Sequence, residues 1–167
     1  MPRPMSLALA LAACAVLAGC GQRSEPSSTP TAGDTPPATS TPAETPPAGA
    51  VSKYDDGPRA GAVPADAALA RQGAELFRAK GCVACHAWGQ QLTGPDLKGV
   101  SMRRTQVWLE NQILHPEVML KEDPITIAVA ANHKLVMTNQ NLTPDQAKAV
   151  IEHLKQQDQD AGLKPER

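Results

Sequence analysis

Aromatic residues are scarce in this chain: its 167 residues include one Phe, one Tyr and two Trp. The part expected to fold spans about a hundred residues, and a domain of that size with so few bulky apolar side chains is only marginally stable by itself. No stretch shows the alternating polar and apolar pattern of a half-buried strand. The sequence therefore predicts an all-α domain whose core is completed by apolar mass from outside the chain.

The chain also lacks an excess of charge of either sign, because 16 basic residues are matched by 17 acidic ones and the formal net charge is −1. This balance excludes the basic stripe typical of nucleic-acid-binding proteins, so we expect no nucleic-acid partner. Long hydrophobic runs are missing as well. The apolar run of residues 5–17 is too short for a confident membrane span.

The N-terminal segment has the features of a signal peptide. Arg3 supplies a positive charge before the apolar run, which ends in small residues. The sequence Leu17-Ala18-Gly19-Cys20 resembles the bacterial lipobox, in which the cysteine is lipidated and becomes the new N-terminus. We therefore predict a signal peptide over residues 1–19, lipidation of Cys20, and a lipid-anchored position on the periplasmic side of a bacterial membrane. An ordinary secretory signal with an incidental Cys20 is the alternative, and the inner and outer membranes both remain open.

Residues 20–64 are rich in Pro, Thr, Ser and Ala. Such a segment cannot bury enough apolar surface to offset the entropy lost on ordering, so it is expected to be a disordered tether. The folded domain is predicted over residues 65–159, and a flexible C-terminal tail over residues 160–167.

Capping and periodicity signals predict about four short helices in this domain. Gly73 in the middle of the first helix costs about 1 kcal/mol relative to alanine, which suggests that another backbone approaches closely there. Thr143 and Gln146 form a capping box at the start of the last helix, with a proline at its first position. Pro116 is expected to end the second helix. The helices are placed at residues 66–80, 105–115 and 125–131, and after Thr143.

The chain has four cysteines, and the two that remain in the domain lie in one motif. Cys14 leaves with the signal peptide and Cys20 is assigned to lipid. Cys82, Cys85 and His86 form the pattern C-x-x-C-H, the attachment signature of a c-type haem, in which each thiol can add to one vinyl group and the imidazole can reach the iron. A zinc site would need a second pair of ligands, for which no cysteine remains, and a thioredoxin-like thiol pair would need a preceding strand. The motif therefore predicts one covalent haem c per chain.

Six residues outside the motif could supply the second axial ligand of the iron. Methionine and histidine ligation both support electron transfer, and methionine raises the potential. Met137 is favoured because it is placed in a loop just before the capped last helix. Met119 is its competitor because we place it in a loop between Pro116 and Pro124. The candidates are Met102, Met119, Met137, His115, His133 and His153.

The domain resembles the class I monohaem cytochromes c over nearly all of residues 65–157. This resemblance implies the cytochrome c fold, with helices and loops wrapped around one covalent haem c. It also implies that the Pro95 carbonyl contacts the His86 imidazole and that Met137 is the distal ligand. The shared features are Gly73 with Phe77, the C-x-x-C-H motif, Thr93-Gly94-Pro95-Asp96-Leu97, Trp108-Leu109, Met137 followed by Asn139-Gln140-Asn141-Leu142-Thr143, and the apolar stripe that ends at Leu154.

Two departures from that family stand out. Thr138 follows Met137 where the family often has proline, which puts the stiffness of the distal loop in doubt. His153 replaces the usual aromatic residue of the last helix, which puts the contacts at the helix crossing in doubt. Residues 116–124 look more specifically like small cytochromes associated with nitrous oxide reductase or sulfite dehydrogenase. Trp108, Arg103 and Arg104 are candidate neighbours of the haem, although each could equally be surface or ordinary core.

The resemblance implies an electron carrier and not an enzyme. Its partners would be redox proteins of a respiratory chain, whose identities the sequence does not give, and no small-molecule substrate is expected. The alternative is a haem-based peroxidase or a gas or redox sensor, which would require a labile distal ligand. A haem-free dithiol oxidoreductase would require both motif cysteines to remain free.

Overall fold

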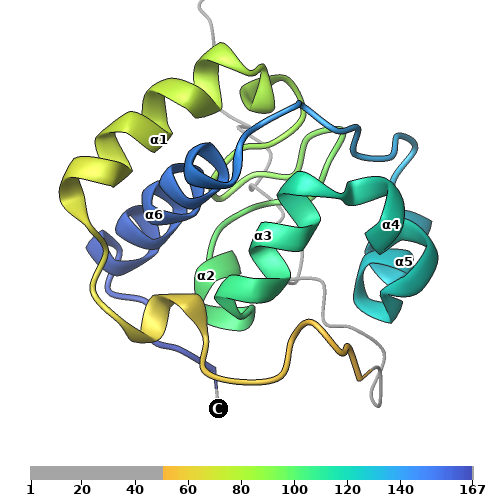
Figure 1. The fold of residues 1–167 in the computed structure, drawn as a ribbon, viewed down its shortest axis with the longest axis horizontal. Helices are drawn as coiled ribbons and strands as arrows, with labels where there is room; N and C mark the ends of the chain where they lie inside the picture. The colour runs from red at the N-terminus through yellow and green to blue at the C-terminus, as the bar shows by residue number, and fades with distance from the viewer. Residues whose placement is uncertain (1–50, 167) are drawn as a thin grey trace, which may run out of the picture. The chain divides into compact units, whose positions relative to one another are not determined.

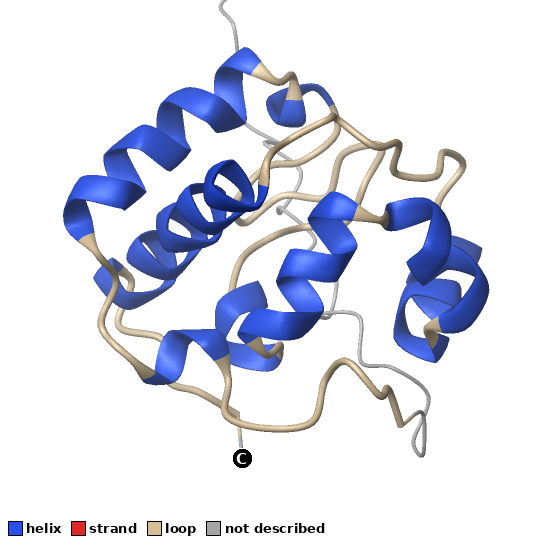
Figure 2. Ribbon diagram, viewed as in Figure 1, coloured by secondary structure: helices blue, strands red, loops and turns tan. Residues whose placement is uncertain are grey.

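The computed structural model describes residues 51–166, which form an all-α domain (Figures 1 and 2). The fold class predicted from the sequence is confirmed for these residues, whereas the signal peptide 1–19, Cys20 and most of the predicted tether lie outside them. An isolated bridge joins Arg59 and Thr105. None of the helices within residues 51–166 is long and apolar enough to cross a membrane. In chain order the elements are η1 (Ala60–Ala62), α1 (Ala67–Ala79), η2 (Cys82–Ala84), α2 (Val100–Arg103), α3 (Gln106–Leu114), α4 (Pro116–Glu122), α5 (Pro124–Ala131) and α6 (Pro144–Asp160).

Helices α1 and α6 pack side by side (Figure 1), and their backbones approach closely at Gly73. A Cβ atom at position 73 would overlap the backbone carbonyl of Ala149 and would lie 3.0 Å from the Cβ of His153. The expected close approach of a second backbone at Gly73 is thus confirmed. His153 still places a ring at this crossing, because its ring centroid lies 5.7 Å from that of Phe77.

Both long helices begin with the caps that the sequence predicts. Oδ1 of Asp66 accepts hydrogen bonds from the N–H groups of Ala68 and Leu69, at 2.8 and 3.0 Å. Thr143 Oγ1 accepts from the N–H of Gln146 at 3.3 Å, and the Gln146 side chain accepts from the N–H of Thr143 at 3.0 Å. These bonds satisfy N–H groups that the first turn of a helix leaves unpaired.

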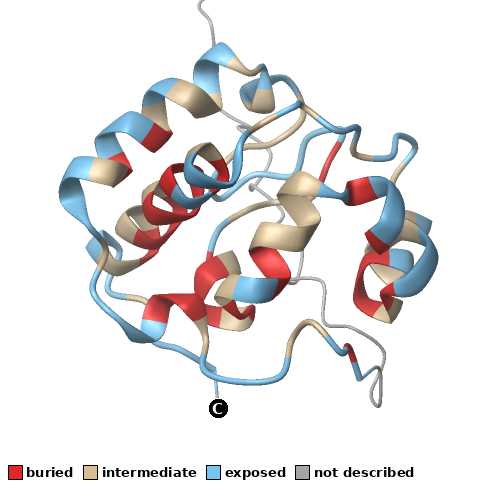
Figure 3. Ribbon diagram, in the orientation of Figure 1, coloured by how far each residue is buried: buried red, intermediate tan, exposed pale blue. Residues whose placement is uncertain are grey.

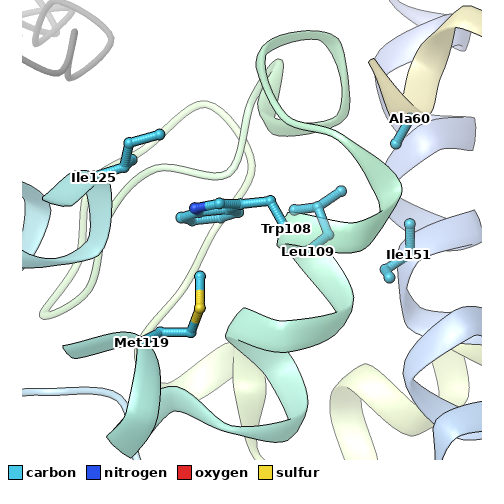
Figure 4. Packing of buried hydrophobic residues seen from close by; sticks show 6 residues of the cluster. All are labelled: Ala60, Trp108, Leu109, Met119, Ile125 and Ile151. Carbon is cyan, nitrogen blue, oxygen red and sulfur yellow. The ribbon is translucent and has the colours of Figure 1, made fainter. Parts of the chain in front are cut away.

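The segment after Pro116 differs from the prediction. Pro116 ends α3 but also occupies the first position of α4, where its missing N–H costs no hydrogen bond. Met119 was predicted to lie in a loop; it is instead helical, fully buried, and packed in the core cluster with Trp108 and Ile125 (Figure 4). Helix α2 is likewise additional to the helices that the sequence predicts.

Residues 52–64, here called the N-terminal strap, belong to the folded domain, so the boundary predicted at residue 65 is too late. The N–H of Thr105 donates to Oδ1 of Asp55 at 2.8 Å, and its hydroxyl donates to the carbonyl oxygen of Tyr54 at 2.8 Å. The N–H of Ala60 donates to the carbonyl oxygen of Arg104 at 2.8 Å, and η1 contains buried residues (Figure 3). The composition of this segment predicts disorder because it contains few apolar residues. The segment is ordered by hydrogen bonds to residues 104 and 105, which composition cannot reveal.

The C-terminal end is also attached to the domain. Helix α6 ends at Asp160, and the N–H of Leu163 then donates to the carbonyl oxygen of Asp158 at 3.1 Å. Further on, the N–H of Glu166 donates to the carbonyl oxygen of Met102 at 2.8 Å. The flexible tail predicted over residues 160–167 is therefore hydrogen-bonded to the domain as far as residue 166.

Candidate functional site

One tight turn after α1 brings together the thiols of Cys82 and Cys85 and the imidazole of His86. The chain enters it through Gly81, whose φ of 75° lies in the left-handed region that favours glycine. The N–H groups of Cys85 and His86 then both donate to the carbonyl oxygen of Cys82, at 3.1 and 2.9 Å. Both cysteines are free and half-buried, and burial raises the pKa of the Cys82 thiol.

A cavity of about 1320 Å³ opens beside this turn. Pockets for drug-sized ligands usually measure about 300–1,000 Å³, so this one has room for a larger group. Its walls come from the motif turn and the loop after it, from α3, α5 and α6, and from the loop that carries Met137. All six residues that the sequence assigns to the cofactor line it: Cys82, Cys85, His86, Pro95, Trp108 and Met137.

The side chains around this cavity fit a covalently attached haem better than a metal ion held by the protein alone. The cavity offers two thiols to a porphyrin, and an imidazole and a thioether to an iron. Among residues 51–166 there is no group of three or more His, Cys, Asp or Glu residues that could hold a metal ion. This part of the chain thus provides no structural zinc site, which typically needs four such ligands.

The His86 imidazole is oriented by the loop that follows it. Its Nδ1 lies 3.0 Å from the carbonyl oxygen of Pro95, and because a carbonyl only accepts, the ring must carry its hydrogen on Nδ1. Gly94 allows this approach, since a Cβ there would lie 2.7 Å from Cε1 of the ring. Burial lowers the pKa of His86, although the bond to Pro95 acts in the opposite direction. A neutral ring held in this tautomer leaves Nε2 free to bind a metal.

Asp158, which was not among the residues predicted for the site, holds the same loop against α6. Its carboxylate is fully buried, and Oδ1 accepts from Nε1 of Trp88 at 2.9 Å and from the N–H of Gly99 at 2.7 Å. Oδ2 accepts from the N–H and the hydroxyl of Ser101, at 3.1 and 2.8 Å. From sequence alone, an acidic residue near the polar end of a helix is expected to be exposed to solvent. The sequence therefore does not indicate that Asp158 is buried and accepts these hydrogen bonds.

Trp108 lines the cavity with its ring, while its N–H is used elsewhere. The side chain is 7% exposed, and Nε1 donates to Oδ1 of Asp123 at 3.0 Å. The guanidinium carbon of Arg104 lies 5.3 Å from the centre of the Trp108 ring. Arg103 and Arg104 also line the cavity. Trp108 is therefore both a core residue and a cavity wall, two possibilities that the sequence left as alternatives.

Two of the six candidates for the second ligand line the cavity within residues 51–166: Met137 and His133. Met119 lies in the core cluster and Met102 is buried on α2. Met137 is half-buried, in a segment without helix that runs up to α6. Although Thr138 replaces the usual proline, this segment is fastened to α3, because Nδ2 of Asn139 donates to the carbonyl oxygen of Leu114 at 2.7 Å.

Comparisons with known proteins agree with this geometry. The family described as cytochrome c matches residues 70–158. A solved structure of cytochrome c from Rhodothermus marinus is 36% identical, with a TM-score of 0.55 over 57% of this chain and 81% of that one. An engineered form of that cytochrome is 35% identical with a TM-score of 0.54, over 56% of this chain and 81% of that one. The same engineered protein bound to a carbene intermediate is 35% identical, with a TM-score of 0.52 over 56% and 80% of the two chains.

No curated protein matches the chain significantly. The family match covers more than half of the chain and includes most of α1, the C-x-x-C-H turn, α3 and nearly all of α6. The cavity beside that turn supplies the place that such a family requires for its cofactor. The chain therefore belongs to the cytochrome c family, whose members carry electrons on a covalently bound haem c.

Proposed function

We propose that this protein is a lipid-anchored cytochrome on the periplasmic side of a bacterial membrane, and that it carries single electrons between redox proteins of a respiratory chain. The observation behind this proposal is one cavity that brings together the thiols of Cys82 and Cys85, the imidazole of His86 and the thioether of Met137. An electron carrier needs no substrate pocket beyond the space that its cofactor fills. The donor and the acceptor are proteins that exchange an electron with the haem.

Each residue of the site then has a definite role. Cys82 and Cys85 would hold the porphyrin covalently, and His86 and Met137 would bind its iron as the proximal and distal ligands. The Pro95 carbonyl fixes the tautomer of His86 through the 3.0 Å contact to Nδ1. When bound, haem c supplies an iron that changes by one electron between its ferrous and ferric states. The protein's contribution is to keep both ligands in place in both states.

The experiment that tests this function measures haem content and spin state. The protein is produced in a host with haem-maturation machinery, and its mass and pyridine haemochrome spectrum are recorded. We expect the mass of the processed, lipidated polypeptide plus one haem, a low-spin spectrum, and no carbon monoxide binding to the reduced protein at neutral pH. The matched variant Cys82→Ser/Cys85→Ser should have the mass of the polypeptide without haem. A colourless parent protein would refute the proposed function.

The membrane anchor is tested separately at Cys20. Multiple acyl chains on this residue would hold the protein stably at a membrane, whereas the serine variant has no attachment point. We expect Cys20→Ser to move the protein from the membrane fraction to the soluble fraction. The haem spectrum should stay unchanged, because Cys20 is not in the domain that lines the cavity. A Cys20→Ser protein that stays in the membrane fraction would contradict the anchor and leave the electron-carrier role intact.

A second candidate function is peroxide turnover or gas sensing at the iron after displacement of Met137. One observation favours it: Thr138 follows Met137 in place of a stiffening proline. The engineered Rhodothermus marinus cytochrome c bound to a carbene intermediate is a precedent for a small ligand in a related protein. Carbon monoxide binding to the reduced protein at neutral pH would favour this candidate over the electron carrier.

A further inference from the structure

We infer that Gln112 and Thr126 are positioning residues for the sulfur of Met137, and that their hydrogen bonds raise the reduction potential of the haem. This inference rests on the proposed function, in which Met137 is the distal ligand. It adds two residues from two different helices to the site. Neither residue was assigned to the cofactor by the sequence.

A chain of two hydrogen bonds connects α5 to Met137 through α3. Nε2 of Gln112 donates to Sδ of Met137 at 3.7 Å, within the longer range that sulfur acceptors allow. Oε1 of the same Gln112 amide accepts from the Thr126 hydroxyl at 2.6 Å. All three side chains line the haem cavity.

The chemistry of the three groups sets the orientation of the Gln112 amide. A thioether sulfur can only accept, whereas a hydroxyl can donate or accept. The amide therefore has partners at both ends in one orientation, with its NH₂ toward Met137 and its oxygen toward Thr126. If the Thr126 hydroxyl were removed, the amide oxygen would lose its partner and nothing on that side would hold the NH₂ toward the sulfur.

Thr126 is itself fixed within the core. It is 7% exposed, and its backbone N–H donates to Oδ1 of Asp123 at 2.7 Å. The same oxygen accepts from Nε1 of Trp108, which lies one helical turn before Gln112 on α3. The beginning of α5 is thus bonded to α3 next to the residue that contacts Met137. A side chain held in this way can place a hydrogen-bond donor in a defined position.

The contact to sulfur has an electronic consequence. A thioether sulfur has two lone pairs, so it can bind iron with one and accept an N–H bond with the other. The N–H bond withdraws electron density from the sulfur and makes it a weaker donor to the metal. A weaker donor favours the reduced iron, so this bond raises the potential, in line with the general effect of hydrogen bonds to ligands.

The test measures the reduction potential and the far-red sulfur-to-iron absorption band of the haem-loaded protein. We expect Gln112→Leu to lower the potential while keeping the band, and Thr126→Val to lower it by a smaller amount. The double variant should match Gln112→Leu, because Thr126 acts through Gln112. Thr126→Ser keeps the hydroxyl and should restore the parent potential. Gln106→Leu is the matched control, since Gln106 lies on the same helix but bonds to Glu110 instead.

Three results would overturn the inference. An unchanged potential in Gln112→Leu with the band intact would show that the contact has no electronic effect. Additive shifts in the double variant would show that Thr126 does not act through Gln112. If the parent protein holds haem but lacks the band, the ligation by Met137 fails, and this inference fails with it. Should Gln112→Leu not retain haem, Thr126→Val compared with Thr126→Ser carries the same test.

Discussion

Replacing Met137 by alanine is expected to abolish the far-red absorption band of the oxidised protein completely. That band requires a sulfur bound to ferric iron, and Met137 is the thioether that lines the cavity within residues 51–166. The reduced variant should bind carbon monoxide at neutral pH, because one axial position becomes available. Its potential should fall as well, since methionine ligation raises it.

Met119→Ala is the control for this experiment, because Met119 was the competing ligand. Its side chain is fully buried among Trp108 and Ile125 in the core cluster, not in the cavity (Figure 4). Loss of so large a buried side chain should lower the free energy of unfolding by about 2–5 kcal/mol while the band remains. The opposite pattern, with the band lost only in Met119→Ala, would reassign the distal ligand.

His133 lines the same cavity, so Met137→Ala should also be combined with His133→Ala. The far-red band is expected to be absent from both variants, because neither contains a sulfur ligand. A low-spin spectrum in Met137→Ala that becomes high-spin in the double variant would show that His133 replaces the missing methionine. This comparison separates a lost ligand from an exchanged one.

The second large effect is expected from Gly73→Ala, which should lower the free energy of unfolding by about 2–3 kcal/mol, in the upper part of the range for overpacked cores. The added methyl group would overlap the Ala149 carbonyl, which is backbone and cannot rotate away. Helices α1 and α6 would have to separate, although they pack against each other along much of their length (Figure 1). Urea unfolding of the haem-loaded protein, followed by circular dichroism, measures the loss.

A pair of variants at Glu75 supplies the control for Gly73. Glu75 is exposed on the same helix, so only the intrinsic helix preference should matter there. We expect Glu75→Ala to be more stable than Glu75→Gly by about 1 kcal/mol. At position 73 the order of alanine and glycine should be reversed. A Gly73→Ala protein more stable than the parent would contradict the tight crossing of α1 and α6.

Signals that act over a few residues were sufficient to predict the starts of α1 and α6. The structure contains the helix caps predicted at Asp66 and Thr143. It also contains the close backbone approach predicted at Gly73. Pro116 misled the prediction because proline is compatible both with the end of one helix and with the first turn of the next. The position of Met119 was wrong for the same reason.

Contacts between distant parts of the chain could not be predicted from the sequence. The strap contact from Asp55 to Thr105 and the bonds from Asp158 to Gly99 and Ser101 at the start of α2 join residues with no common periodicity. The contact of Gln112 with Met137 depends on how α3 and the distal loop are placed in space. The C-x-x-C-H motif was predictable because both thiols that attach the haem and the imidazole that binds its iron lie within five consecutive residues.

If Cys20 anchors the protein to a membrane, the N-terminal strap shortens the distance over which the domain can reach its partners. The predicted tether runs from Cys20 to residue 64, but residues 52–64 are part of the folded domain through hydrogen bonds to Thr105 and Arg104. Removing these thirteen residues from the free length shortens the maximum reach by about 40 Å, at about 3.1 Å per residue of extended chain. A shorter tether keeps the domain close to the bilayer, so it should exchange electrons with membrane-bound proteins more readily than with freely diffusing ones.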